Sequence, residues 1–317
     1  MSDPSTEAAA LDPEALVARL ITLLTVEEID TDLYRGAPLP GGKGRVFGGQ
    51  VIAQALQAAQ QTIADRPVHS LHAYFMRPGE EGLPIVYQIA RDHDGKSFAT
   101  RRVIASQHGR PILNMLLSFQ APEDGLEHHD PMPDVPDPES LTSEADYWRA
   151  RADRLSAGAA GQLLRPRPIE IRHLEARSPF STRPRPPRAG SWFRAVGALP
   201  EDPGMHRAIL AFASDMTLLG TSNMPHGVSY MTPGFQSASL DHALWIHAPF
   251  RADDWLLYMT DSPWAGGARG FNRGQIFTRD GRLVASVAQE GLMRMRPVVD
   301  PDLAAPEPPH PDLRSPS

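Results

Sequence analysis

An internal duplication constrains the fold of this 317-residue chain more than any other feature of its sequence. Two stretches, about 13–125 and 166–296, each contain one apolar helix-like segment followed by strand-like segments in the order of an antiparallel meander. The expected helices are 47–59 and 206–219, and the expected strands are 70–77, 84–90, 98–107 and 112–120 in the first stretch and 237–247, 255–260, 270–278 and 283–294 in the second. The duplication predicts two tandem repeats of one α+β unit.

The helix over 47–59 is apolar nearly all round, which is typical of a helix buried in the interior. An antiparallel sheet must cover its apolar face with a second layer. We therefore expect an antiparallel sheet wrapped around a central helix in each repeat. The last two strands of each repeat flank a turn containing Gly109 or Gly281, and aligning these glycines places Leu117 on Gln289.

Proline marks the segments between and outside the repeats. The chain has 32 prolines, about twice the usual share, and proline cannot donate to a ladder or to a helix interior. We expect a flexible N-terminal tail over 1–12, a first domain over 13–125, a linker over 126–165 with a short helix near 143–156, a second domain over 166–296 and a Pro-rich disordered tail over 297–317.

The charge and the cysteine count exclude several classes of protein. The net charge is −7, and neutralising nucleic-acid phosphates needs a basic surface, so we expect no nucleic-acid partner. The chain has no cysteine, which excludes disulfides and thiolate metal sites and fits a reducing compartment. The acidic N-terminus does not resemble a signal peptide, and no apolar run is long enough to span a bilayer. We expect a cytoplasmic protein without membrane insertion.

Several catalytic motifs are missing from the sequence. It contains no Gly-x-Ser-x-Gly nucleophile elbow and no phosphate-binding loop of the Walker type. His69 and His72 fall on opposite faces of a strand, which is a poor arrangement for a metal site. We expect neither a metal nor a cofactor.

Three polar residues interrupt apolar segments of the second repeat. Asp215 lies within the helix-like segment, Ser239 lies near the start of a strand, and Gln289 breaks the otherwise apolar last strand. A buried carboxylate, hydroxyl or amide costs free energy unless it finds a partner. The simplest solution is that these side chains meet each other or an ordered water. The first repeat lacks the aspartate and has Leu117 in place of the glutamine, so we expect it to be structural or to bind substrate.

The chain resembles the acyl-CoA thioesterase II family over roughly 13–296. The segments that carry the resemblance are Leu33-Tyr-Arg-Gly36, Val46-Phe-Gly-Gly-Gln-Val51, His69-Ser-Leu-His-Ala-Tyr-Phe-Met-Arg-Pro-Gly79, Arg101-Arg-Val103, Ser118-Phe-Gln120, Ala213-Ser-Asp215, Pro225-His-Gly227, Ser239-Leu-Asp-His-Ala-Leu-Trp245, Ala268-Arg-Gly270 and Gln289-Glu-Gly-Leu-Met-Arg294. The resemblance implies a double hot-dog fold and hydrolysis of fatty acyl-CoA to free acid and CoA, a step of fatty acid and lipid metabolism.

The resemblance also implies a catalytic trio, which falls on Asp215, Ser239 and Gln289. Serine replaces the commoner threonine and keeps the hydroxyl. The chemistry of these side chains fits the role, because a buried carboxylate has a raised pKa and can accept the proton of an attacking water. A hydroxyl and an amide can orient that water.

Substrate contacts are expected at two places. Backbone N–H groups of Gly48 and Gly49, which open the first helix, are candidates to stabilise the oxyanion. Arg101, Arg269 and Arg273 are candidates to bind CoA phosphates, since arginine matches phosphate oxygens bidentately.

His242 is expected to be a packing or supporting residue. A direct pair with Asp241 is not expected, because adjacent strand residues point to opposite faces. Exposed sheet edges and an apolar helix seam predict a homo-oligomer, a dimer or a tetramer.

Two alternatives remain open at this level. The same fold also hosts enoyl-CoA hydratases and dehydratases, but these need an Asp/His dyad in a Gly-Asp-x-Asn-Pro setting that the chain lacks. A non-catalytic acyl-CoA binding module would be expected to lose Asp215 or Gln289, and both are present.

Overall fold

The computed structural model describes residues 12–176 and 178–296. The expected tails over 1–12 and 297–317 lie outside the described residues, apart from Asp12, the residue before the first helix. Among the described residues no helix has the length and apolar character that a membrane span requires.

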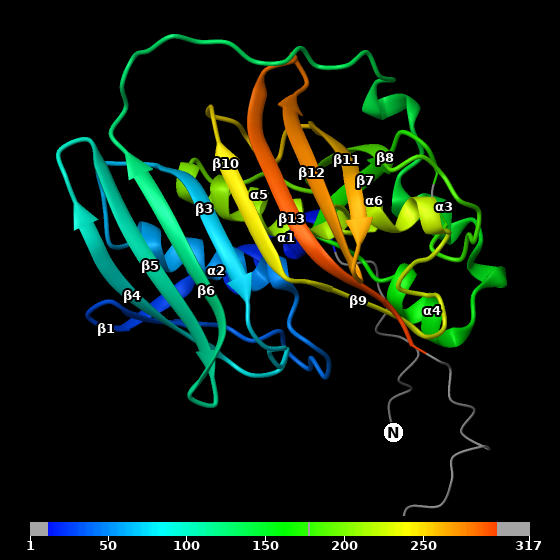
Figure 1. Cartoon of the computed structure of the whole chain (residues 1–317), viewed down its shortest axis with the longest axis horizontal. Helices are drawn as coiled ribbons and strands as arrows, with labels where there is room; N and C mark the ends of the chain where they lie inside the picture. The colour runs from blue at the N-terminus through cyan, green and yellow to red at the C-terminus, as the bar shows by residue number, and fades with distance from the viewer. Residues whose placement is uncertain (1–11, 177, 297–317) are drawn as a thin grey trace, which may run out of the picture.

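Thirteen strands of the described residues form one antiparallel sheet (Figure 1). The first repeat contributes, in spatial order, β1 (Val26–Asp30), β2 (Leu33–Gly36), β4 (Ile85–Asp94), β5 (Phe98–Gln107), β6 (Arg110–Gln120) and β3 (Val68–Phe75). The sheet continues with β10 (Asp241–Ile246), β13 (Leu283–Met295), β12 (Arg269–Thr278), β11 (Leu256–Gly266), β8 (Arg188–Ala195) and β7 (Ile169–His173). β9 (Phe235–Ser239) pairs with β13. The strand order is the same in both repeats when it is read outward from the centre, which confirms the internal duplication.

The sheets of the two repeats are joined edge to edge. β3 pairs with β10, placing Leu71 opposite Leu244 and Tyr74 opposite Asp241. Each of these strands ends the sheet of its own repeat and would leave a row of backbone groups without partners. Their pairing satisfies both rows, so the wrapped sheets expected for the separate repeats form one surface.

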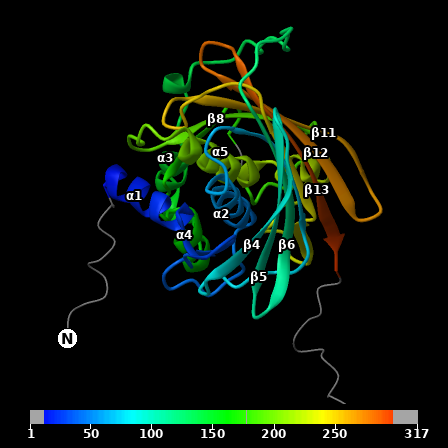
Figure 2. The same cartoon turned by 90° about the vertical axis from the view of Figure 1, so that its left-hand side faces the viewer.

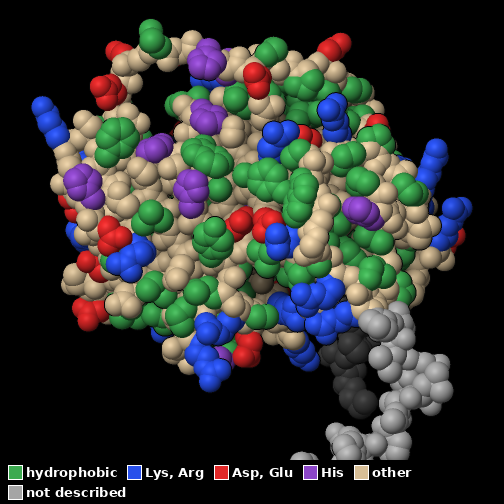
Figure 3. All heavy atoms as spheres, viewed as in Figure 1, with side chains coloured by type: hydrophobic (Ala, Val, Ile, Leu, Met, Phe, Trp, Pro, Cys, Tyr) green, Lys and Arg blue, Asp and Glu red, His purple; other side chains and the backbone are tan. Residues whose placement is uncertain are grey.

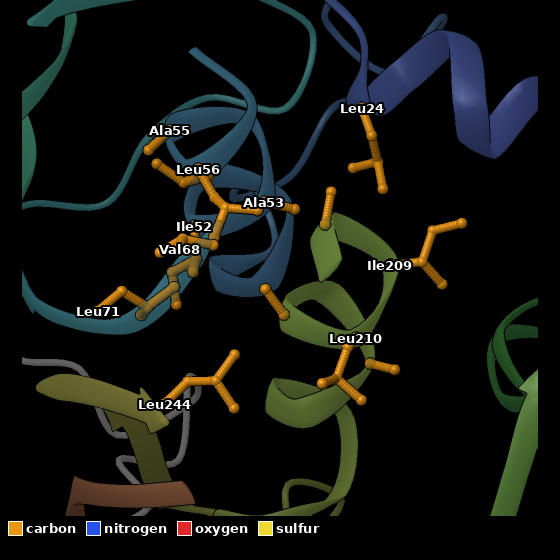
Figure 4. Close-up of a cluster of buried hydrophobic side chains, with 14 of the residues drawn as sticks. Leu24, Ile52, Ala53, Ala55, Leu56, Val68, Leu71, Ile209, Leu210 and Leu244 are labelled. Atoms are coloured by element: carbon orange, nitrogen blue, oxygen red, sulfur yellow. The ribbon is translucent and has the colours of Figure 1, made fainter. Parts of the chain in front are cut away.

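Two central helices lie inside the curved sheet (Figure 2). The helix expected over 47–59 is α2 (Gly48–Gln60), and the helix expected over 206–219 is α5 (Pro203–Thr217). They run antiparallel, since Gln60 at the end of α2 donates to the carbonyl of Gly204 at the start of α5, at 3.3 Å. Figure 4 shows Ile52 and Leu56 of α2 with Ile209 and Leu210 of α5 in one core. α1 (Pro13–Leu24) adds Leu24 to this core.

Sequence patterns miss four of the strands. β1 and β2 are short, and all of β1 except Val26 is exposed, so no alternation marks it. β7 lies within the Pro/Arg-rich segment 165–189 and β8 begins at its end, and this composition is not typical of strands. The strand expected over 237–247 is divided at Leu240 into β9 and β10, which both pair with β13.

The segment between the repeats passes over one end of the sheet (Figure 1). Trp192 of β8 holds it there by donating to the carbonyl of Pro136 at 2.9 Å. In place of the single short helix expected near 143–156, the structure has α3 (Glu144–Arg149) and α4 (Ala157–Leu163) with two 3-10 turns, η2 (Pro138–Ser140) and η3 (Ala152–Arg154). After α5 the chain forms α6 (Gly220–Asn223) and η4 (Met224–His226) before it enters β9.

Candidate active site

Asp215 lies in the last turn of α5 and is 8 % exposed. α5 begins where Asp202 accepts a hydrogen bond from the N–H of Gly204 at 2.8 Å, with Pro203 at the first helical position. Because α5 runs antiparallel to α2, its last turn meets the first turn of α2. The carboxylate is therefore held between two helices and the sheet.

Ser239 and Gln289 approach this carboxylate from the sheet. Gln289 Nε2 donates to Asp215 Oδ1 at 2.7 Å, and Ser239 Oγ donates to the same oxygen at 3.4 Å. Ser239 ends β9 opposite Gly291 of β13, two residues beyond Gln289. The three residues singled out in the sequence thus lie together, and the buried Asp215 and Gln289 partner each other as buried polar groups should.

The carboxylate also occupies the N-terminus of α2. Phe47 precedes this helix and offers no side-chain acceptor to its first N–H groups. The backbone of Gly49 hydrogen-bonds to Asp215 instead. A negative charge at a helix N-terminus is stabilised by the helix dipole, so Asp215 fills the place of a capping residue supplied by the other repeat.

Burial raises the pKa of Asp215 to about 6. Hydrogen bonds from Gln289, Gly49 and Ser239 act in the opposite direction, because they favour the charged form. A carboxyl group with this pKa is ionised at neutral pH and is still a stronger base than an ordinary aspartate. It can accept a proton from a bound water.

A cavity of about 590 Å³ opens beside the trio and is lined by Gly48, Asp215 and Ser239. Its wall includes apolar side chains such as Met216 and Leu219. Other parts of the wall come from α3, from the Pro/Arg-rich segment 165–189 and from the loop 224–230. A larger hollow of about 680 Å³ contains Arg251 and Arg279 but none of the predicted site residues. We assign the site to the smaller cavity because the chemical groups lie there.

The two glycines that open α2 have different surroundings. Gly48 lines the cavity, and a Cβ at this position would lie 2.7 Å from Asp215 Oδ2 and 2.9 Å from the ring of Phe75. Its lack of a side chain therefore lets the backbone approach the carboxylate. The backbone of Gly49 is already used by Asp215, so Gly48 is the better candidate of the two for an oxyanion donor.

The arginines expected to bind CoA phosphates do not line the cavity. Arg101 is 1 % exposed and donates to Thr62, Asp94 and backbone carbonyls, so it is a buried structural group of the first repeat. Arg269 pairs with Glu290 and Arg273 with Asp261 on the exposed surface of β12. We do not carry these three residues forward as phosphate contacts.

Three further polar residues lie near the trio, of which the sequence analysis names His242 as a packing or supporting residue and misses Tyr258 and Asn272. His242 of β10 is fully buried, and its Nδ1 lies 3.9 Å from Asp215 Oδ1. Tyr258 of β11 is close enough to Asp215 for the carboxylate to contribute to its raised pKa, after the larger effect of burial. Asn272 of β12 pairs with Gln289 across the β12·β13 ladder and is fully buried. The sequence signal for each was only a polar residue in an apolar strand.

The first repeat has no equivalent constellation. In the β3·β6 ladder Leu71 lies opposite Leu117. In β10·β13 Ala243 lies opposite Ala288, so one step further along the ladder His242 faces Gln289. The described residues contain no group of three or more His, Cys, Asp or Glu side chains that could hold a metal.

Comparisons with known families match both repeats. The model of the acyl-CoA thioesterase family matches residues 165–292, and that of the acyl-CoA thioesterase N-terminal domain matches residues 37–120. Acyl-CoA thioesterase 2 of Haemophilus influenzae is 39% identical over 280 residues, which cover 88% of this chain and 98% of that protein. Acyl-coenzyme A thioesterase 8 of Homo sapiens is 40% identical over 292 residues, which cover 88% of this chain and 89% of that protein.

Solved structures give the same result for the fold. An acyl-CoA thioesterase II from Mycobacterium marinum is similar with a TM-score of 0.71 and 39% identity, over 87% of this chain and 98% of that one. A hot-dog protein from Alicyclobacillus acidocaldarius has a TM-score of 0.70 at 17% identity and covers 88% of this chain and 98% of its own. This similarity confirms the hot-dog architecture in both repeats. Because relatives at about 40% identity span nearly the whole of both chains, this chain belongs to the acyl-CoA thioesterase family.

Proposed function

We propose that the chain hydrolyses fatty acyl-CoA by attack of a water molecule that Asp215 deprotonates. Membership of the acyl-CoA thioesterase family makes acyl-CoA hydrolysis its activity. The observation that carries the proposed mechanism is the convergence of Ser239 and Gln289 on a carboxylate with a pKa of about 6 at the edge of a cavity.

The proposed reaction has two steps. Asp215 takes a proton from water while the water oxygen bonds to the thioester carbon, giving a tetrahedral oxyanion. The oxyanion then collapses, the carbon–sulfur bond breaks, and the departing CoA thiolate takes the proton from Asp215. Gln289 fixes Asp215 Oδ1, and Oδ2 faces Gly48 at the cavity, where the water and the oxyanion would lie.

Ser239 orients the water in this proposal and does not attack the carbonyl. Its hydroxyl makes a long hydrogen bond of 3.4 Å to Asp215 Oδ1, an oxygen already occupied by Gln289. An activated serine needs an unoccupied base within good hydrogen-bond reach. A water route leaves no acyl-enzyme, so an acyl group trapped on Ser239 by rapid quench would overturn this assignment.

The Pro/Arg-rich segment is the proposed site for the CoA phosphates. It is fastened over the cavity by the N–H of Arg185, which donates to the carbonyl of Met224 at 3.0 Å, and by Ser229 Oγ, which donates to the carbonyl of Pro179. Gly227 permits the close approach, because a Cβ there would lie 2.2 Å from the carbonyl oxygen of Thr182 and its φ is +61°. This segment places Arg183 in the cavity wall.

Arg183 has the properties that a phosphate contact needs. It is exposed, and its side chain makes no ion pair with any residue that the structure describes. Nearby Arg185 and Arg167 also line the cavity, each within 4.0 Å of one carboxylate. An unpaired guanidinium can bind a phosphate bidentately without first losing another partner.

A panel of acyl-CoA chain lengths tests the proposed function. Thiol release, read by a colorimetric reagent, should match the free acid formed, and the protein contributes no thiol of its own because it has no cysteine. Hydration of enoyl-CoA without thiol release would favour the hydratase alternative. Binding of acyl-CoA without turnover would favour the binding module.

Arg183→Ala should raise the KM for acyl-CoA about tenfold, the value of one charge-assisted hydrogen-bonded contact, and leave kcat nearly unchanged. The same acyl group on pantetheine, which lacks the nucleotide phosphates, should show no change in KM. Arg35→Ala is the control. Arg35 of β2 pairs with Glu27 of β1 in the other repeat, and Arg35 does not line the cavity. An equal rise in KM for both thioesters would contradict a phosphate contact.

We also propose a cytoplasmic homo-oligomer, a dimer or a tetramer. The cysteine-free sequence fits a reducing compartment, which cell fractionation can test. Figure 3 shows hydrophobic side chains spread over the face of the sheet that is turned toward the viewer. Exposed side chains of the sheet strands include Tyr74, Phe98, Leu116 and Trp264, and exposed apolar area of this kind favours association. Light scattering that gave a monomer would reject the proposal.

A further inference from the structure

We propose that His242 is a positioning residue that raises the proton affinity of Asp215 by presenting an unprotonated Nδ1 to its carboxyl group. The inference rests on the proposed role of Asp215 as the base. It concerns a buried side chain that the reaction scheme does not use.

The hydrogen bonds of Ser214 indicate which nitrogen of His242 carries the proton. Ser214 Oγ donates its single hydrogen to the carbonyl of Ala211 at 2.9 Å. The same Oγ lies 2.9 Å from His242 Nε2, and it has only lone pairs left for this contact. We infer from this assignment of the Ser214 hydrogen that Nε2 is the donor. In the neutral ring the other nitrogen, Nδ1, then has a lone pair and no proton.

His242 stays neutral because it is buried without a charged partner on Nε2. Burial lowers the pKa of His242 to about 4. Nδ1 is buried and has no hydrogen-bond partner in the described structure. Asp215 Oδ1 lies 3.9 Å from it.

A lone pair directed at a carboxyl group changes its protonation in one direction. Facing the carboxylate form, Nδ1 and Oδ1 are two acceptors with no proton between them, which is unfavourable. In the acid form, whose proton arrives on Oδ2 from the cavity, the lone pair of Nδ1 faces a neutral group, so this repulsion is relieved. The contact therefore favours protonated Asp215 and raises the pKa of this residue, which makes it a stronger base for water.

The other groups around Asp215 act differently. Gln289, Ser239 and the backbone of Gly49 all donate to the carboxylate and lower its pKa. Tyr258 is the other titratable side chain facing it, and its hydroxyl donates to the carbonyl of Ser214 at 3.0 Å. His242 differs from these donors because its Nδ1 presents a lone pair to the carboxyl group.

The duplicated fold provides an internal comparison. The first repeat has a leucine at each of the positions that correspond to His242 and Gln289, namely Leu71 and Leu117, which face each other across β3·β6. All four side chains are buried. Packing in this part of the fold therefore does not require a histidine, and the polar pair occurs in the repeat that contains Asp215.

His242→Gln tests the proposal with little change in packing. The glutamine amide can reach Ser214 Oγ as Nε2 does but places no acceptor where Nδ1 lies. The acid limb of the kcat/KM against pH profile should move to lower pH by about one unit. The plateau kcat should fall roughly threefold, because a weaker base takes the proton.

His206→Gln is the matched control. His206 is 4 % exposed, lies near the other end of α5, and accepts from the N–H of Ala252 through Nδ1 at 3.0 Å. The same substitution there should lower stability without moving the acid limb. An unmoved limb in a folded, active His242→Gln protein would overturn the inference.

A measurement on the unmutated protein keeps the proposal testable if the variant does not fold. Nitrogen-15 NMR of the imidazole should show Nε2 protonated and Nδ1 unprotonated from pH 5 to 8. A proton on Nδ1 in this range would reject the inference. If the unmutated protein released no thiol from any acyl-CoA, the proposed function would be rejected instead. The two failures are therefore distinguishable.

Discussion

Asp215→Asn should lower kcat by roughly 10²–10⁴-fold, the usual contribution of a general base, and leave the fold intact. The asparagine has the same shape, and its carbonyl oxygen can still accept at the N-terminus of α2. It has no basic group for the proton of water. Steady-state thiol release measures the loss, and a thermal melt measures the fold.

Asp241→Asn is the matched control for this substitution. Asp241 begins β10, two residues from Ser239, and accepts from the N–H of Glu290 at 2.7 Å. An asparagine oxygen can accept the same hydrogen bond, so this variant should keep nearly all activity. A folded Asp215→Asn protein with a kcat near that of the Asp241→Asn control would contradict the role of Asp215.

The pH dependence of the unmutated protein follows from the same carboxyl group. With a pKa of about 6, Asp215 is protonated below that pH and cannot accept a proton from water. The value of kcat/KM should therefore fall about tenfold per unit below pH 6 and level off above it. In the Asp215→Asn protein the residual rate should lack this limb.

Much of the fold can be predicted from the sequence, because its strongest signals are local. α2 is apolar around its whole circumference, and β5 and β6 flank a glycine turn, so periodicity and turn chemistry indicate them directly. β1 is short and mostly exposed, and β7 lies within the Pro/Arg-rich segment. These strands form because the edge of the sheet offers them backbone partners, which a local pattern does not contain.

The residues of the site also differ in whether local sequence patterns indicate them. Asp215 and Gln289 are visible because each is polar within an apolar segment, and Ser239 because it opens a strand with other small polar residues and matches the family pattern. The role of His242 depends on which way Ser214 donates, and that hydrogen bond involves residues of both α5 and β10. From the sequence, Arg101 is expected to bind phosphate for a related reason. The local sequence does not show that its guanidinium will donate to Thr62 and Asp94 in the interior.

Gln289→Leu should lower kcat about 100-fold, comparable with the loss of one preorganised donor in an active site. Leucine is the residue that the first repeat has at this place in the ladder, Leu117, so the strand accepts its shape. The substitution removes the 2.7 Å hydrogen bond that fixes Asp215 Oδ1. It also removes a contact that favours the charged carboxylate, so the acid limb of the pH profile should move to higher pH, opposite to His242→Gln.

Combining Gln289→Leu with Ser239→Ala tests whether both side chains serve one water. Each donates to the same oxygen of Asp215, so once one is lost the other can no longer hold the water and carboxylate in a productive geometry alone. The double variant should therefore lose less activity than the product of the two single losses. Ser239→Thr, which keeps a hydroxyl on the same Cβ, should retain most activity and serves as the control. Fully multiplicative losses would mean that the serine and the glutamine act at separate steps, and the serine would then need a role other than orienting the attacking water.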